Sequence, residues 1–454
     1  MLKTLTNLND ALKPAVEAIT DINGIVNGFV WGTFGIGLLL FAGILMTLIN
    51  RGFQFTHIGH WFKNTIGAIF WMWVMAIFGM MTNYSENVLG IYYRRKNAKG
   101  EWSGGAMYYL RDGLGSKKGC KQIGMILAVL FSCFCLLASF GIGNMSQVNS
   151  IAGNMKSAFD IPTWITGVCI VILSAFVILG GLKRVAAVTE KLVPVMAVLY
   201  IIGAVIICIA NIDQFGAVFG SIFKGAFAMK AAGGGIIGYG VSRAITWGFK
   251  RGAFSNEAGL GSSVMVHSSS NVKEPVRQGM WGIFEVFADT IVVCTLTAFC
   301  ILSSGLVDLE TGQMLTDIEG SGLVGQAFAG VFGSVGPKFI AIAILLFAYS
   351  TVLGWSHYGT KAFEFLFGTK ATVIYKAVFV IMAYFGCTMS LGLAWDLSDT
   401  FNGLMMIPNL IGVLALSGTV GKITSNYIRR TFHGSKEEPM YSAFADIQRE
   451  QLKK

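Results

Sequence analysis

Charge is scarce in this 454-residue chain. Asp, Glu, Lys and Arg make up only 13% of the residues, whereas hydrophobic residues make up 54%. A soluble domain carries about twice that share of charge, so the composition excludes an ordinary soluble protein. Apolar runs of about 20 residues, each long enough to cross the hydrocarbon core as a helix, recur along the chain. We therefore predict an all-α polytopic membrane protein of the plasma or inner membrane.

Proline, paired cysteine and enzyme motifs are also scarce or missing. The 7 prolines leave most apolar runs unbroken, and none of the 8 cysteines forms a CxxC pair, so neither a disulfide framework nor a metal framework is expected. The chain has no GxxxxGK[ST] motif for ATP and no HExxH or GxSxG motif. We expect no enzymatic activity and no cofactor. A membrane channel is one possible function, although the sequence shows no repeated selectivity filter and no ring of charged residues.

The net charge of +10 is not read as a nucleic-acid signal. Basic residues collect in short loops, where the positive-inside rule explains them, so the expected surroundings are a lipid bilayer and no nucleic acid. Residues 1–26 lack an apolar h-region, so no removable signal peptide is expected. We divide the chain into a lead-in (1–26), a transmembrane domain (27–418) and a cytoplasmic tail (419–454).

About ten transmembrane helices are predicted from the apolar runs. Nine of them are well delimited by length and composition, at residues 27–49, 66–93, 123–143, 161–179, 192–210, 280–302, 339–355, 371–391 and 397–416. If the basic loop 94–121 is cytoplasmic, every later loop obeys the charge rule, and the acidic loop 303–322 falls outside. The loop around Arg51 and Lys63 does not obey it, because one span separates it from the loop 94–121. Either that loop is outside or one crossing is absent, so the orientation of residues 1–93 stays open.

The segment from 238 to 267 interrupts the apolar pattern with glycine, hydroxyl and charged residues. Backbone that leaves a helix at membrane depth survives only inside protein or beside a water-filled cavity. A broken polar segment of this kind is typical of a site for a small charged solute. The alternative is an ordinary loop between two spans.

Five stretches of the sequence resemble the alanine or glycine:cation symporter family (sodium:alanine symporters). They are GAIFWMWVMAIFGMMT at 67–82, SQVNSIAG at 146–153, GGLKRVAAVTEKLVP at 180–194, RGAFSNEAGLGSS at 251–263 and AYSTVLGWSHYG at 348–359. The resemblance implies a leucine-transporter-type fold, in which two five-helix repeats of inverted topology hold substrate and cation near the midplane. It also implies sodium-coupled uptake of alanine or glycine.

Family members carry a broken helix of the form GTGNIAGV before the GAxFWMWV run, and this sequence has none. We therefore expect an incomplete first repeat, with the first core helix deleted. A truncated, transport-incompetent member of the same family is the alternative. The choice between alanine and glycine, the preference for D- or L-forms, the cation stoichiometry and the oligomeric state stay open.

The resemblance also points to site residues. A zwitterionic amino acid needs partners for both charged ends and a pocket for its side chain. The positions that match are Gln147, Phe254, Ser255, Asn256 and Trp355. Other interpretations remain. Gln147 could be an amide that pairs two helices, Phe254 an ordinary packing aromatic, and Trp355 a tryptophan of the interfacial belt.

Hydroxyl oxygens for sodium, the coupling ion, are expected from Ser350 and Thr351, since sodium is a hard cation. Both residues also fit as simple hydrogen bonders between helices. Arg251 and Glu257 flank the break and are expected to be structural pairs or gate charges. Glu86 is expected at the interface or in a gate, with a buried functional carboxylate as the alternative.

Overall fold

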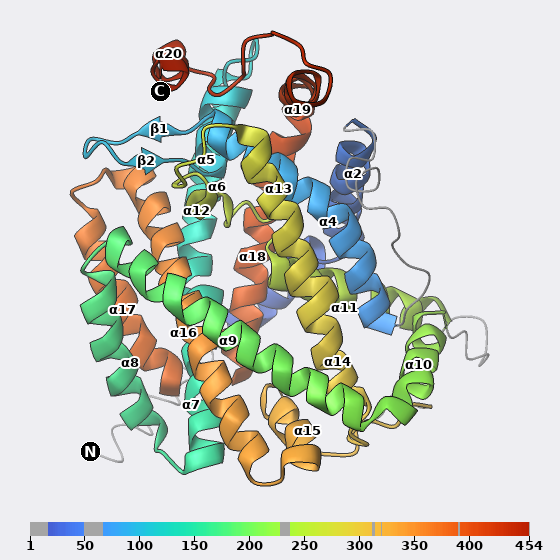
Figure 1. Ribbon diagram of the computed structural model, residues 1–454. Helices are drawn as coiled ribbons and strands as arrows, with labels where there is room; N and C mark the ends of the chain where they lie inside the picture. Colours follow the sequence, from blue (N-terminus) through green and yellow to red (C-terminus); the bar gives the residue numbers. More distant parts are fainter. Residues whose placement is uncertain are drawn as a thin grey trace.

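The computed structural model describes residues 17–49, 67–227, 237–310, 314–318, 320–388 and 391–453. These residues fold almost entirely as helices packed side by side (Figure 1), which confirms the all-α prediction. Two short strands, β1 (Arg95–Lys96) and β2 (Trp102–Ser103), form an antiparallel hairpin. The loop around Arg51 and Lys63 lies outside the described residues.

The first half of the chain contributes α2 (Thr33–Ile49), α4 (Gly67–Tyr92), α5 (Ala106–Tyr108), the π-helical η1 (Tyr109–Leu114), α6 (Lys121–Phe140), the π-helical η2 (Gly141–Met145), α7 (Ser146–Phe159), α8 (Thr163–Ile178), α9 (Leu182–Ala210), the 3₁₀ turn η3 (Ile212–Gln214) and α10 (Phe215–Phe227). The second half contributes α11 (Ile237–Asn256), α12 (Val264–His267), α13 (Pro275–Val286), the π-helical η4 (Phe287–Val293), α14 (Cys294–Leu302), α15 (Gly322–Phe332), α16 (Val335–Phe367), α17 (Thr372–Thr388), α18 (Leu391–Ala415), α19 (Ser417–Phe432) and α20 (Ala445–Lys453).

Large apolar side chains face outward from the bundle. On α8 and α9, Phe176 is 70% exposed, Ile209 66% and Ile172 62%. A patch of this kind in water marks an interaction surface or an aggregation liability, whereas in a bilayer it meets acyl chains. Within the described residues, five helices, or six with the bent pair 397–415 and 417–432, are long and apolar enough to cross a membrane. The multi-pass class is therefore supported, and the number of about ten spans stays a prediction.

Several helices are longer than their apolar runs. The run predicted as a span at 123–143 belongs to a continuous helix, Lys121–Phe159, and α16 extends well past the predicted 339–355. The extension of α16 carries Lys361 and Glu364, whose side chains are only 4% and 9% exposed and form an ion pair of 3.2 Å. Charged residues end a hydropathy run but do not end a helix when they are paired inside the protein.

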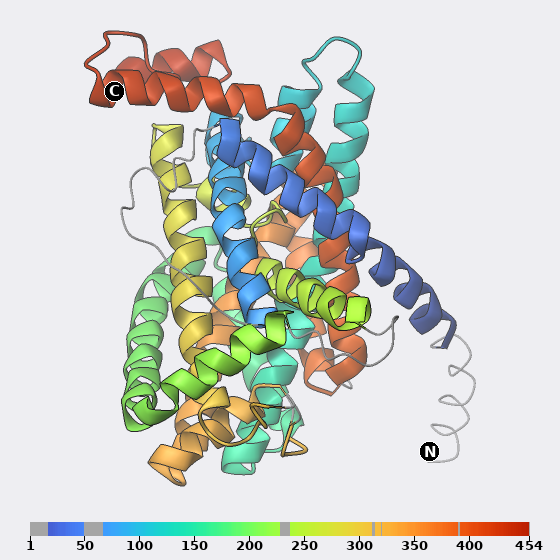
Figure 2. The same ribbon diagram turned by 90° about the vertical axis from the view of Figure 1, so that its right-hand side faces the viewer.

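The ends of the bundle differ in charge. The hairpin β1–β2, α19 and α20 cover one end, and α15 with the acidic loop before it lies at the other end (Figures 1 and 2). The turn between α8 and α9 lies at the hairpin end, since Gly181 and Lys99 line one small cavity there. This separation agrees with the prediction that the basic loops share one side of the membrane. We call the hairpin side the inner end and the α15 side the outer end.

The helices α2 and α4 are consecutive in the described chain and run in the same direction (Figure 2). Both finish at the inner end against α19: Ile49 packs against Gly421, and the Tyr84 hydroxyl lies 2.7 Å from the Thr424 hydroxyl. Antiparallel helices would need only a short turn, whereas parallel neighbours need a return of the chain across the bundle.

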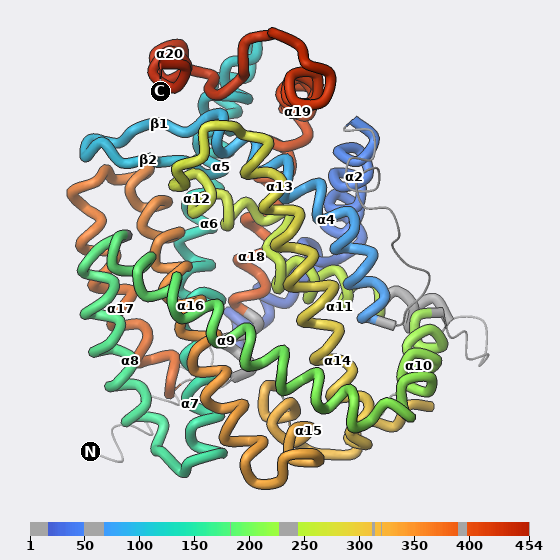
Figure 3. The backbone as a smooth tube through the Cα atoms, viewed as in Figure 1, coloured from blue at the N-terminus to red at the C-terminus, as the bar shows by residue number. Residues whose placement is uncertain are grey.

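The remaining helices enclose the site region. The helix α9, which contains Pro194, crosses the bundle obliquely in contact with α14 and α16 (Figure 3). The segment α11–α12 follows α4 along its whole length: Gly248 lies against Ala68, Ala258 against Gly79, and Val264 against Gly90. The eight cysteines are all free thiols.

Candidate functional site

The helix α11 ends at Asn256, and helical structure resumes only at Val264, within the segment predicted to be broken. Glu257, Gly259 and Gly261 take positive φ angles of 57°, 89° and 74°, a conformation that ends a right-handed helix. The Asn256 side chain accepts the Ala258 amide at 3.0 Å. We call residues 257–263 the break.

Two glycines of the break are required by space as well as by conformation. A Cβ atom on Gly259 would lie 2.4 Å from Leu39 Cδ2, and one on Gly261 would lie 2.5 Å from Asn409 Oδ1. Only glycine accepts both the positive φ and the close approach. The sequence GLG in this position is therefore a geometric requirement.

A buried polar cluster holds the break in place. Asn409 of α18 donates its amide to the Gly259 carbonyl at 2.8 Å and also to the Glu86 carboxylate of α4. The Tyr109 hydroxyl donates to Asn409 Oδ1, and Ser262 donates to Glu257 at 2.7 Å. Glu86 and Asn409 are fully buried, so these partners bond groups that water does not reach, although Glu86 Oε2 accepts no hydrogen bond from the described residues. The burial of Glu86 differs from the expectation of an interfacial residue and agrees with the alternative of a buried carboxylate; its contact with Asn409 was not predicted.

A cavity of about 710 Å³ opens beside the last turn of α11, before the break, and brings together three of the predicted site residues. Gln147 from α7, Phe254 from α11 and Thr351 from α16 line it, together with the start of α15. Towards the outer end, Asn154 donates to the Ser321 hydroxyl at 2.6 Å. The cavity has the mixed apolar and polar lining that a small amino acid requires.

Ser255 and Asn256 turn away from this cavity towards η4. The Ser255 hydroxyl donates to Asp289 Oδ2 at 2.5 Å, and Asn256 Nδ2 donates to the Thr290 hydroxyl at 2.9 Å. Asp289 and Thr290 are absent from our sequence-based site set. Glu285 and Asp289 are the two acidic residues within the apolar run 280–302, and they were a signal, because an ionisable group at membrane depth is a functional candidate by default.

Trp355 and Ser350 lie on α16, on either side of Thr351 along the helix. Trp355 is 2% exposed and packs against Gly143, where a Cβ atom would lie 2.3 Å from its own Cβ. Its buried position differs from that of an interfacial-belt tryptophan. Both the Ser350 and the Thr351 hydroxyls donate to the Phe347 carbonyl, at 2.8 and 3.1 Å, which leaves their oxygen lone pairs available.

The two cations that precede the break share one carboxylate, whereas Glu257 forms no ion pair among the described residues and accepts the Ser262 hydroxyl. Arg251 lies 3.1 Å from Asp399 and Lys250 lies 2.7 Å from the same carboxylate, as expected for a structural pair involving Arg251. At the inner end, Arg94 donates to the carbonyls of Ser270 and Val272, each at 2.6 Å. Burial lowers the pKa of Arg94 to about 10, so the guanidinium keeps its charge at neutral pH.

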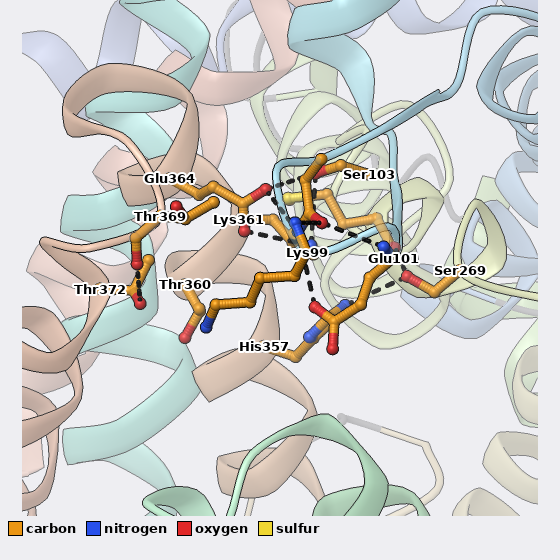
Figure 4. A network of polar contacts seen from close by, with 12 residues as sticks. Lys99, Glu101, Ser103, Ser269, His357, Thr360, Lys361, Glu364, Thr369 and Thr372 are labelled. Carbon is orange, nitrogen blue, oxygen red and sulfur yellow. Dashed lines mark hydrogen bonds and ion pairs between the residues drawn. The ribbon is translucent and has the colours of Figure 1, made fainter.

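A second polar network ties the hairpin to α16 at the inner end (Figure 4). Glu364 accepts hydrogen bonds from Ser103 at 2.9 Å and Asn97 at 3.2 Å, and Lys361 lies 3.3 Å from the same serine. A small cavity of about 100 Å³ lies beside this network and is lined by Lys99 and His357 among others. The inner end is therefore closed by polar contacts, whereas the large cavity lies towards the outer end.

Comparison with known proteins decides the family. A family model described as the sodium:alanine symporter family matches residues 64–442. Over 451 positions the chain is 42% identical to the sodium/alanine symporter AgcS of Methanococcus maripaludis, covering 89% of this chain and 97% of the relative. This chain belongs to the sodium:alanine symporter family. The resemblance drawn from the five sequence stretches is confirmed.

Two relatives from Bacillus subtilis are also similar to this chain over most of its length. The chain is 35% identical over 379 positions to the amino-acid carrier protein AlsT of Bacillus subtilis, covering 83% of this chain and 76% of the relative. It is also 35% identical over 377 positions to the probable sodium/glutamine symporter GlnT of the same organism, covering 83% and 74%. The names of these relatives agree on amino-acid or sodium-linked transport and differ in the amino acid.

Proposed function

We propose that this chain symports sodium and a small neutral amino acid, alanine or glycine, into the cell across the cell membrane. The observation that carries the proposal is the cavity beside the last turn of α11, together with membership of the sodium:alanine symporter family. Gln147 and Phe254 line that cavity, and the Gln147 amide both donates and accepts hydrogen bonds. We assign Gln147 to the polar end of the substrate and Phe254 to the wall of a small side-chain pocket.

The other predicted residues take supporting positions in this proposal. Trp355 fixes the π-helical turn at Gly143 behind the cavity, and Ser255 and Asn256 carry the end of α11 into the break. Ser350 and Thr351 offer hydroxyl oxygens to sodium from α16, because both donate their protons to a backbone carbonyl and keep their lone pairs. The leucine-transporter-type arrangement, in which such a break holds substrate and cation near the midplane, belongs to the same proposal.

The test is uptake of labelled alanine or glycine by proteoliposomes that contain the full chain. An inward sodium gradient should drive uptake, and replacing sodium by choline should abolish it. Uptake through a channel would follow the substrate gradient alone and would not accumulate substrate. Comparison of the two amino acids as competitors ranks their specificity.

A second candidate is a family member that has lost one membrane crossing and does not transport. The observation in its favour is the common direction of α2 and α4. Residues 50–66 alone connect these helices, and they include Arg51 and Lys63. A helical crossing takes about 20 predominantly apolar residues, which this segment does not supply.

The comparison with the archaeal relative supports the same candidate. The alignment is 451 positions long, but it includes only 89% of the 454 residues of this chain, which is fewer residues than positions. Some residues of the relative therefore have no counterpart in this chain. Thiol labelling from each side of the membrane, at cysteines introduced in place of Asn64 and Lys99, tests the candidate. A crossing between Asn64 and Lys99 places the two labels on opposite sides, and labels on the same side contradict the observed direction of α4.

A further inference from the structure

The helices α9 and α14 lie against each other in matched register as they approach the outer end (Figure 1). The Tyr200 hydroxyl of α9 lies 2.6 Å from the Thr297 hydroxyl of α14. About one turn further along both helices, the Cys300 thiol of α14 donates to the Ala204 carbonyl of α9 at 3.7 Å. Both helices end shortly afterwards, so the register holds up to the outer end.

This register brings a second thiol next to Cys300. In an α-helix the carbonyl of one residue accepts the amide of the residue four positions later, so the Ala204 carbonyl lies beside the backbone of Cys208. Helical side chains also lean towards the N-terminus of their helix, which directs the Cys208 side chain back along α9. The two thiols accordingly lie within hydrogen-bonding reach of each other. Ala204 is fully buried, and its small side chain lets the two helices approach closely.

The surroundings of the two thiols suit oxidation in sequence. Cys300 is buried, whereas Cys208 is partly exposed, so an oxidant meets the Cys208 thiol first and Cys300 lies behind it. Both residues stand near the outer end, on the side of the membrane that the charge rule places outside. Disulfides form and persist on that side of a cell membrane, whereas the cytosol keeps thiols reduced.

From this arrangement we propose that Cys208 and Cys300 form a disulfide on oxidation, and that the bond locks the outer ends of α9 and α14 together. The Cys208 thiolate attacks one sulfur of a small disulfide oxidant, and the first oxidant thiolate leaves. The Cys300 thiolate then attacks the Cys208 sulfur of this mixed disulfide, and the second oxidant thiolate leaves. The two cysteines lose two electrons to the oxidant, and the two leaving thiolates take up the two thiol protons.

The lock bears on the helix that covers the large cavity. A buried cluster joins Tyr200, Ala204 and Cys300 to Phe328 of α15, and the Phe328 ring stacks on Tyr200 with 6.1 Å between centroids. The start of α15 lines the cavity of about 710 Å³. A covalent bond between α9 and α14 therefore fixes the support of α15, and oxidation should slow the entry of solutes into the cavity.

Oxidation is tested on the purified full-length chain with one equivalent of dithiodipyridine, a small aromatic disulfide. Mass spectrometry of the digested protein should find two peptides linked through Cys208 and Cys300, which dithiothreitol separates. The melting temperature of oxidised wild type should rise by several degrees, because a cross-link across a long loop constrains the unfolded state. Cys208→Ser and Cys300→Ser should show neither change. Cys120→Ser, a partly exposed thiol at the start of α6, is the matched control and should behave as wild type.

The wild-type measurement decides the proposal even if a serine variant does not fold. Oxidised wild type without the linked peptides, or with the linked peptides and an unchanged melting temperature, would overturn the proposal. A rise of equal size in Cys208→Ser would also overturn it, because the rise would then come from another reaction of the oxidant.

Disulfide formation is measured without transport, so its outcome is separate from that of the symport. Linked peptides in a chain that takes up no alanine or glycine support the disulfide and contradict the symport. In a chain that transports, oxidation should slow uptake severalfold in wild type and not in Cys208→Ser, and dithiothreitol should restore it. Unchanged uptake by fully cross-linked protein contradicts the lock and leaves the symport supported.

Discussion

The Asp399 carboxylate of α18 lies 2.7 Å from the Lys250 ammonium of α11, and the side chains are only 2% and 9% exposed. Arg251 reaches the same carboxylate at 3.1 Å. One acid thus compensates two cations at the outer side of the break, where α11 and α18 meet. The two helices that shape the break are joined there by charge as well as by packing.

Removing the charge of Asp399 should destabilise the protein strongly. Asp399→Asn leaves Lys250 buried without a counter-ion, and breaking a buried pair in this way costs about 3–5 kcal/mol. The measurement is the melting temperature in detergent, with Asp213→Asn as an exposed aspartate control. Equal melting temperatures for the two variants would contradict the structural role of the pair.

Alanine in place of Gly261 should damage the break. The substitution places a Cβ atom 2.5 Å from Asn409 Oδ1 at a positive φ of 74°, and such strain costs about 1–3 kcal/mol. We expect a lower melting temperature and the loss of any sodium-driven uptake.

The matched control for Gly261→Ala is Gly37→Ala. Gly37 lies in α2, where an added Cβ atom would meet no other atom within 4 Å, and alanine favours a helix. If both variants keep wild-type uptake and stability, the geometry of the break is not required.

The contacts of Glu364 should hold the hairpin closed over the inner end. Glu364→Ala removes the acceptor of Ser103 and Asn97 and leaves the buried Lys361 without its partner. We expect trypsin to cut the hairpin, at Arg95, Lys96 or Lys99, severalfold faster than in wild type, because proteolysis follows local opening.

Glu101→Gln is the control for Glu364→Ala, since Glu101 is an exposed hairpin carboxylate. Cleavage at the wild-type rate in Glu364→Ala, or an equal acceleration in both variants, would show that the network does not hold the hairpin.

The contribution of Asp112 to stability should depend on pH in one direction. Burial raises the pKa of Asp112, but hydrogen bonds from Arg111 and Arg95 outweigh burial, and the pKa lies below its usual value. The folded state therefore binds its proton more weakly than the unfolded state. The stabilisation is present above the unfolded pKa, near 3.9, and is lost as pH falls through the folded pKa.

The experiment compares the melting temperatures of wild type and Asp112→Asn from neutral to acid pH. Wild type should be the more stable protein by a constant margin between about pH 5 and 8, where both states are ionised, and the margin should shrink in acid. A difference in melting temperature between wild type and Asp112→Asn that grows on acidification would contradict the predicted direction of the pH dependence.

Much of the helical fold could be predicted from the apolar runs and from the glycine and polar residues that interrupt them. The features that could not be predicted have physical causes. The break at 257–263 is readable because glycine and polar residues interrupt an apolar run. The full length of α16 is not readable, because Lys361 and Glu364 are buried as a pair only when the hairpin covers them. The contacts of Asn409 could not be predicted from the sequence either, because its partners Glu86 and Tyr109 come from segments that are distant in the chain.

The candidate site was predictable in part. Gln147, Phe254 and Thr351 meet at one cavity, whereas Ser255 and Asn256 face η4, since residues one position apart on a helix point about 100° apart. Asp289 was visible as one of two acidic residues, with Glu285, in the apolar run 280–302. Its partners were not, because the π-helical turn that orients it leaves no clear mark in composition.

Sodium-driven uptake is the measurement that tests the account most directly. Proteoliposomes containing the full chain are given labelled alanine or glycine with an inward sodium gradient, with equal sodium on both sides, or with choline. The account predicts accumulation above the outside concentration only with the gradient. Absence of sodium-driven accumulation, in protein shown to be folded by its melting transition, would contradict it.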